Sequence, residues 1–63
     1  MSANTYGVSD EQITRLDVGE TVYVDAYEEV TVLGVVSRLR RVDVERPDGT
    51  LDSIAFDQVA LSA

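Results

Sequence analysis

The sequence lacks the side chains on which most small-protein chemistry depends. Among its 63 residues there is no cysteine, no histidine and no tryptophan, and all five basic residues are arginine, so lysine is absent as well. Without cysteine there is no disulfide framework and no thiolate metal site. Without histidine the usual proton shuttle and the commonest metal ligand are missing, and without lysine there is no Schiff-base nucleophile. We therefore expect a protein that is not an enzyme and that holds no cofactor and no metal.

Long apolar runs are also missing. No stretch approaches the ~20 apolar residues of a membrane-spanning helix. Residues 1–5 lack the basic region and the apolar core of a secretory signal, so we expect a cytoplasmic protein. A chain this short buries only about 60 % of its unfolded surface. We expect one small domain over residues 9–63, preceded by a flexible tail over residues 1–8.

Carboxylates dominate the charged residues. Twelve Asp and Glu against five Arg give a formal net charge of −7, which strains a compact state by self-repulsion in dilute salt. That strain disappears where the Debye length falls to about 3 Å, near an ionic strength of about 1 M. Guanidinium is also more weakly hydrated than ammonium. The composition resembles that of proteins from salt-in halophiles, chiefly haloarchaea, and we expect a halophilic source; an ordinary acidic protein is the alternative.

A helix-start signal follows the tail. Ser9 is suited to the N-cap, and Gln12 falls at the position that closes a capping box. Val8 and Ile13 have the spacing of a hydrophobic staple across the helix start. These residues predict a short helix over residues 10–16, which needs tertiary packing to persist.

From Thr21 onward the pattern is that of short β-strands. Alternating and β-branched runs predict strands over residues 21–27, 30–36, 41–45, 51–56 and 60–62. The unbroken second run indicates a central strand covered on both faces, and Gly34 within it indicates a bend. Residues 46–50 read as a hairpin turn with Gly49 in the left-handed position, and residues 56–59 as a 3₁₀ turn.

We expect the core to come from the inward-facing positions of these strands and from the 3₁₀ turn over residues 56–59. The predicted core residues are Val22, Val24, Val30, Val32, Val36, Val42, Val44, Ile54, Phe56, Val59 and Leu61.

This layout resembles the Src-homology-3-like small barrels, the architecture shared by KOW, Tudor and Sm-type modules. The segments that carry the likeness are residues 17–24, 32–36, 48–49 and 56–59. The resemblance implies a mainly β fold, a small antiparallel five-strand barrel with a short N-terminal helix. Only Glu28 and Glu29 separate the first two strands, which leaves no room for the long first loop of the signalling versions. Peptide-binding residues are therefore not carried over.

Four of the five arginines fall within one short segment: Arg38, Arg40, Arg41 and Arg46. One interpretation is a basic edge that binds a protein or a nucleic acid. The other is a set of cross-strand ion pairs, worth ~0.2–1 kcal/mol each, with the carboxylates Asp43, Glu45, Asp48 and Asp52. The surrounding net charge of −7 opposes nucleic acid, so ion pairs or a protein contact are favoured over it.

Two tyrosines are the other candidate binding residues. Tyr23 and Tyr27 fall on one side of the predicted first strand, where they would form an amphipathic platform for a partner or for unpaired bases. The alternative is that they border the core and cover the helix beside Ile13 and Leu16.

The sequence therefore predicts a small, non-catalytic protein-interaction module adapted to high salt. We expect a protein partner or self-association through an unprotected sheet edge, and no membrane. The alternatives are a nucleic-acid-associated accessory protein of KOW or Sm type, and a small subunit of a larger assembly.

Overall fold

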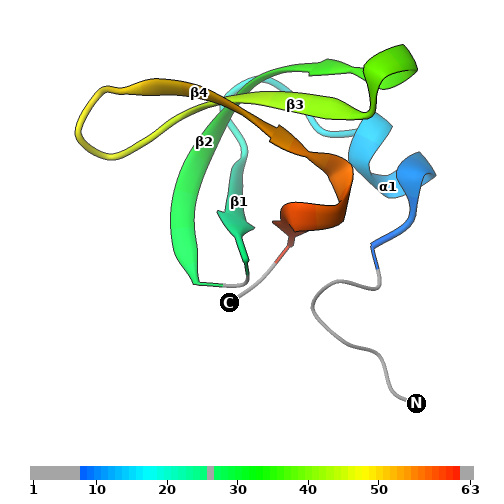
Figure 1. The fold of residues 1–63 in the computed structure, drawn as a ribbon, viewed down its shortest axis with the longest axis horizontal. Coiled ribbons are helices and arrows are strands. Elements are labelled where there is room, and N and C mark those ends of the chain that lie inside the picture. The colour runs from blue at the N-terminus through cyan, green and yellow to red at the C-terminus, as the bar shows by residue number, and fades with distance from the viewer. Residues whose placement is uncertain (1–7, 26, 62–63) are drawn as a thin grey trace.

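The computed structural model describes residues 8–25 and 27–61, which form one five-stranded antiparallel sheet and one short α-helix (Figure 1). Along the chain the elements are α1 (Asp10–Thr14), β1 (Thr21–Val24), β2 (Glu28–Val36), the 3₁₀ turn η1 (Ser37–Leu39), β3 (Arg41–Glu45), β4 (Leu51–Ala55), the 3₁₀ turn η2 (Phe56–Gln58) and β5 (Val59–Ala60). The strand order is β4-β3-β2-β1-β5. The expected mainly β class is confirmed. None of the helices in these residues is long and apolar enough to cross a membrane.

The helix begins as predicted. Ser9 has an extended backbone, and its Oγ accepts a hydrogen bond from the Gln12 N–H at 3.2 Å. In return the Gln12 Oε1 accepts the Ser9 N–H at 3.0 Å. Both halves of the capping box are present, so two N–H groups that the first turn leaves without a helical partner are satisfied.

The helix is shorter than the sequence indicates. It ends at Thr14 instead of Leu16. The Leu16 N–H donates to the carbonyl of Ile13 at 3.0 Å, and this i→i−3 hydrogen bond is of the 3₁₀ type and not of the α-helical type. Ile13 is fully buried, and Val8 and Leu16 pack against the core. The remainder of the predicted tail, residues 1–7, lies outside the described residues.

The first strand also ends early. The prediction of a strand to Tyr27 is wrong, because β1 stops at Val24 and Asp25 takes a left-handed backbone with φ 53°. Aspartate tolerates this conformation better than most residues. The Tyr27 N–H then donates to the Val24 carbonyl at 3.2 Å, which reverses the chain into β2. Ala26 falls outside the described residues.

The second strand is central, as predicted, but it starts at Glu28. Its first half pairs with β1 and its second half with β3. The register shifts between Val32 and Gly34, so Leu33 is an extra residue in a β-bulge that bends the strand. Leu33 is 38 % exposed, so the expectation of a strand covered on both faces is wrong.

The hairpin between β3 and β4 has the predicted turn. Gly49 adopts φ +89°, and its N–H donates to the Arg46 carbonyl at 2.9 Å. The Arg46 N–H donates to the Thr50 carbonyl at 2.8 Å, and the Asp48 Oδ1 accepts the Thr50 N–H at 2.9 Å. The hydrogen bond to Thr50 lowers the pKa of Asp48.

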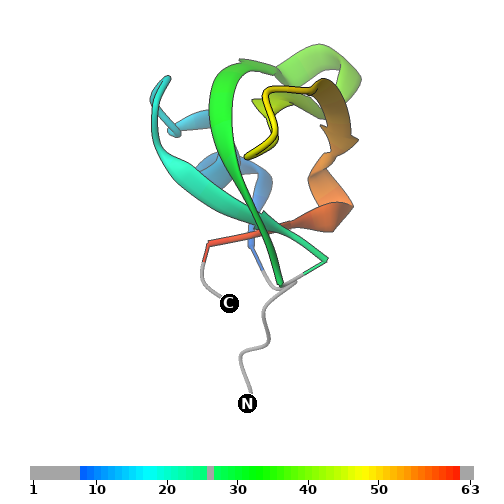
Figure 2. The ribbon, with the colours of Figure 1, turned by 90° about the vertical axis from the view of Figure 1, so that its left-hand side faces the viewer.

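The sheet curls strongly but is not closed, so the prediction of a barrel is corrected to an open sheet. β4 and β5 are its two edges and do not pair with each other, although only η2 separates them in sequence. The 3₁₀ turn η2 lies where a turn was predicted, and it connects the end of one edge strand to the start of the other. Within the described residues, no ladder of backbone hydrogen bonds forms between the two edges. The wrapped shape is visible when the molecule is viewed from its side (Figure 2).

The concave side of this curled sheet holds the core. Every predicted core residue is buried except Val36, which is half-buried, and Leu61, which is 42 % exposed. The last strand is Val59–Ala60 instead of the predicted residues 60–62, so Leu61 lies beyond it; Ser62 falls outside the described residues. Ile13 and Ala60 complete the core, and none of its side chains is polar or charged in the part of the chain that the structure describes.

Candidate functional site

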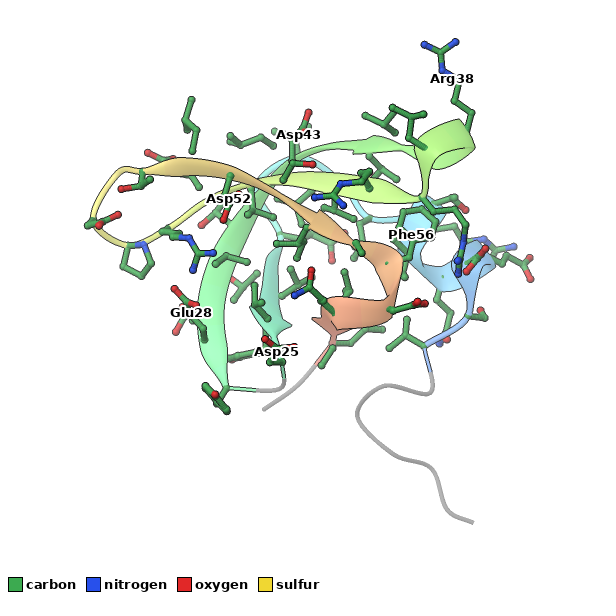
Figure 3. All side chains as sticks on the ribbon, in the orientation of Figure 1. Asp25, Glu28, Arg38, Asp43, Asp52 and Phe56 are labelled. Carbon is green, nitrogen blue, oxygen red and sulfur yellow. The ribbon has the colours of Figure 1, made fainter. Side chains whose placement is uncertain are left out.

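Arg46 closes one end of the concave side. Its guanidinium donates from Nη1 to Glu28, at the start of β2, and from Nη2 to the Asp52 Oδ2 on β4 at 2.6 Å. The hydrogen bond to Glu28, and to a smaller extent the one to Asp52, raises the pKa of Arg46. The bond from Arg46 in turn holds the pKa of Asp52 below its usual range. Figure 3 shows Glu28 and Asp52 at this end of the sheet. The predicted cross-strand pair with Asp52 is confirmed.

Arg40 ties the helix to the opposite end of the sheet. It follows η1 with a left-handed φ of 52°, and its Nε and Nη2 donate to the two oxygens of Asp10 at 3.0 and 2.9 Å. Asp57 lies 3.5 Å from the same Nη2, and the guanidinium stands 5.5 Å from the centre of the Phe56 ring. The hydrogen bond from Arg40 lowers the pKa of Asp10. This arginine therefore joins α1, η1 and η2.

The other two arginines of the segment diverge. Arg41 is half-buried on β3 and donates to Ser53 on β4, to Oγ at 3.1 Å and to the carbonyl oxygen at 2.6 Å. Arg38 projects from η1 into solvent (Figure 3) and makes no hydrogen bond or ion pair with any residue that the structure describes. Three of these neighbouring arginines thus make separate contacts and the fourth faces solvent, so they do not gather into one basic patch.

The two tyrosines do not share the first strand as predicted. Tyr23 is half-buried on β1, opposite Glu29 of β2. Tyr27 is 81 % exposed in the turn before β2, at the opposite end of that nine-residue strand from Arg38. The structure therefore does not bring Tyr27 beside Arg38.

The free edge of β4 is occupied by side chains. In an antiparallel ladder, alternate residues direct their N–H groups away from the neighbouring strand. On β4 the Ser53 N–H donates to the Asp52 Oδ1 at 2.8 Å, and the Ala55 N–H donates to the Gln58 Oε1 at 3.1 Å. Donors that would otherwise recruit another strand are therefore satisfied within the chain.

The convex side of the sheet carries a second group of residues that the fold does not use. We call Leu33, Asp43, Glu45 and Leu51 the outer face. Asp43 and Glu45 alternate with buried valines on β3, and Leu51 stands opposite Glu45 on β4. Leu33 precedes the residue opposite Asp43 on β2. Figure 3 shows Asp43 directed away from the sheet.

Exposure and missing contacts distinguish the outer face. Leu51 is 69 % exposed and Leu33 38 %. Neither Asp43 nor Glu45 accepts a side-chain hydrogen bond or ion pair from the residues described here. Arg41, which alternates with the buried valines of β3 as Asp43 and Glu45 do, donates to Ser53 instead. The result is a negatively charged surface with an apolar side chain at each side.

Within residues 8–25 and 27–61 there is no group of three side chains placed to hold a metal ion, and no cavity. No family model matches the chain, and no curated protein or solved structure shows significant similarity to it.

The sequence did not single out the outer face. Leu33 belongs to a run predicted to be covered on both faces, but it alternates with buried Val30 and Val32 and so faces outward. The signal for Leu51 was present, since it follows the turn out of phase with Ile54 and Phe56.

Proposed function

We propose that this chain is a small non-catalytic protein-interaction module that docks a partner on the outer face. The observation that carries the proposal is the coincidence of exposed Leu33 and Leu51 with unpartnered Asp43 and Glu45 on one side of the sheet. The guanidinium groups of Arg40 and Arg46 form ion pairs within the fold. Two outward amide groups of β4 donate hydrogen bonds to side chains of the same chain. These facts favour the outer face over the arginine segment and the sheet edge as the docking surface.

We propose in addition that the module is related to the Src-homology-3-like small barrels. A four-strand meander, the 3₁₀ turn η2 and a last short strand beside β1 support this assignment. The two-residue length of β5 and the open sheet are departures from a closed barrel.

We also propose that the protein works in the cytoplasm of a halophilic organism. The net charge of −7 and the absence of lysine support this. The free energy of unfolding should rise as KCl increases from about 0.05 M to about 2 M, because repulsion between carboxylates is screened. Urea unfolding followed by circular dichroism measures it; equal stability at both concentrations would contradict the proposal.

Affinity capture with surface variants tests the docking surface. The tagged protein is incubated with a lysate of its own organism at high KCl, with and without nuclease. L33S/L51S should lose the captured protein, because it removes the apolar contacts. The matched control V18S/L39S changes two residues that are 72 % and 63 % exposed elsewhere, and should retain it.

Three results would overturn the proposal: capture that is unaffected by L33S/L51S, capture lost equally in both variants, or capture that disappears with nuclease. The last result would restore the nucleic-acid alternative.

A further inference from the structure

We infer that the outer face binds a basic, amphipathic protein segment, an inference that rests on the proposed interaction function. Charge complementarity is the first argument. Asp43 and Glu45 have no partner among the described residues, and Glu29 extends the negative charge along β2 on the same side. Arginine or lysine side chains would neutralise them, and guanidinium in particular pairs with carboxylate through two parallel hydrogen bonds.

The positions of the leucines give the second argument. Each leucine flanks one carboxylate: Leu33 lies beside Asp43, and Leu51 beside Glu45. Leu33 and Leu51 are two strands apart and offset by about two residues. This places them about 10 Å apart across the strands and about 7 Å along them, hence roughly 12 Å on the diagonal, with the carboxylates between them.

That diagonal defines the segment. A helix rises 1.5 Å per residue, so apolar residues seven or eight positions apart would reach about 10–12 Å and contact both leucines. Basic residues three or four positions after the first apolar residue lie on the same helix face and would stand over Asp43 and Glu45. The partner is therefore a helix with an apolar–basic–apolar stripe.

Salt explains why both kinds of contact are needed. Exposed ion pairs are screened at high ionic strength, whereas burial of apolar surface is not weakened by screening. A partner held by charge alone would dissociate under the conditions proposed for this protein. Leu33 and Leu51 supply the salt-tolerant part of the contact, and Asp43 and Glu45 select a basic partner.

A second copy of this chain fits the surface poorly. Two outer faces brought together would oppose Asp43 and Glu45 on each copy, and the whole chain carries a charge of −7. A nucleic acid would be repelled by the same carboxylates.

A peptide titration tests the inference. The probe is a synthetic helical peptide with two leucines one heptad apart, arginines between them on the same face, and alanine and glutamine elsewhere. It is added to ¹⁵N-labelled protein, first in dilute and then in concentrated KCl, and amide shifts are followed by NMR. Shifts should cluster at Leu33, Asp43, Glu45 and Leu51, and binding should persist, though weaker, at high salt.

Matched variants of the protein identify the contacts. D43N/E45Q should weaken binding about tenfold, or ~1.4 kcal/mol shared between two exposed pairs. The control D17N/D25N removes the same charge from carboxylates off the outer face, and asparagine also tolerates the left-handed backbone of Asp25. It should change the Kd by about twofold or less.

The remaining results of these experiments would contradict different parts of the inference. Equal weakening by D43N/E45Q and D17N/D25N would show non-specific attraction and overturn the inference. Equal binding of a peptide with glutamine in place of arginine would overturn the requirement for a basic segment. If no peptide binds but affinity capture still depends on Leu33 and Leu51, the inference fails and the proposed function stands. If capture also ignores these leucines, both fail.

Discussion

Ile54 and Leu51 lie on the same strand in opposite surroundings. Ile54 is 3 % exposed in the core, whereas Leu51 is 69 % exposed on the outer face. The contrast extends over the sheet. Among the residues described, the buried side chains of the inner face are all apolar and are bounded by the ion pairs of Arg40 and Arg46, whereas Asp43 and Glu45 on the outer face have no partner. In a chain this small, one face of the sheet is needed for folding, and the other is available for a partner.

The largest expected effect comes from truncating the inner of these two residues. Ile54→Ala should lower the free energy of unfolding by ~2–5 kcal/mol through lost burial and a cavity. This is comparable to the ~3–5 kcal/mol that a core of this size supplies. Leu51→Ala should change it by less than about 0.5 kcal/mol. Urea unfolding at fixed KCl measures both, and a similar loss in the two variants would remove the distinction between the faces.

A second test concerns the hairpin that connects β3 to β4. Gly49→Val places a β-branched side chain at φ +89° and should cost ~1–2 kcal/mol or more. Gly34→Ala is the control, because a Cβ added there meets no atom within 4 Å and the backbone is not left-handed. It should be tolerated, to within about 0.5 kcal/mol. If Gly49→Val were as stable as Gly34→Ala, the hairpin would not depend on glycine geometry.

A smaller loss is expected at the boundary of the core. Arg46→Gln removes the link between Glu28 and Asp52 and should lower the urea midpoint, by less than Ile54→Ala does. Arg38→Gln changes charge equally at a side chain that projects into solvent, and should leave the midpoint unchanged. Equal midpoints for the two variants would mean that Arg46 does not hold the two strands together.

The smallest effect is expected in the acid limb of the stability curve. The pKa values of Asp10, Asp48 and Asp52 are lowered by hydrogen bonds in the folded state, from an ordinary value of 3.8. Their stabilisation is therefore complete above that value and is lost as the pH falls below it. Arg46→Gln should flatten this dependence, because the pKa of Asp52 is lowered chiefly by Arg46. Unfolding midpoints measured from neutral pH to pH 3 check it, and an unchanged slope in the variant would contradict it.

Local chemistry made much of this fold predictable from sequence. The capping box of Ser9 and Gln12 and the turn at Gly49 were predicted correctly, because each depends on residues within one turn of the chain. Alternation placed most core valines correctly for the same reason. The early end of β1 before Asp25 was missed, because the alternation of apolar and polar residues continues through it in the sequence.

Contacts between distant residues were not predictable in this way. Arg46 pairs with Glu28 as well as with Asp52, and Arg40 with Asp10, and the sequence contains many carboxylates that would serve equally well. The bulge at Leu33 and the failure of the edges to pair depend on how the strands curl. The outer face therefore became visible only when the strands were in register.

The side-chain caps on β4 have a consequence for colloidal behaviour. Near the isoelectric point the repulsion that disperses an acidic protein vanishes, and a bare strand edge would then seed aggregation. Because the pKa of Asp52 is held below its usual range, its oxygen still accepts the Ser53 amide when ordinary carboxyls have begun to protonate. Gln58 covers the Ala55 amide at any pH. These two donors of the β4 edge therefore stay covered in the pH range where charge no longer keeps molecules apart, and light scattering across that range would register the protection.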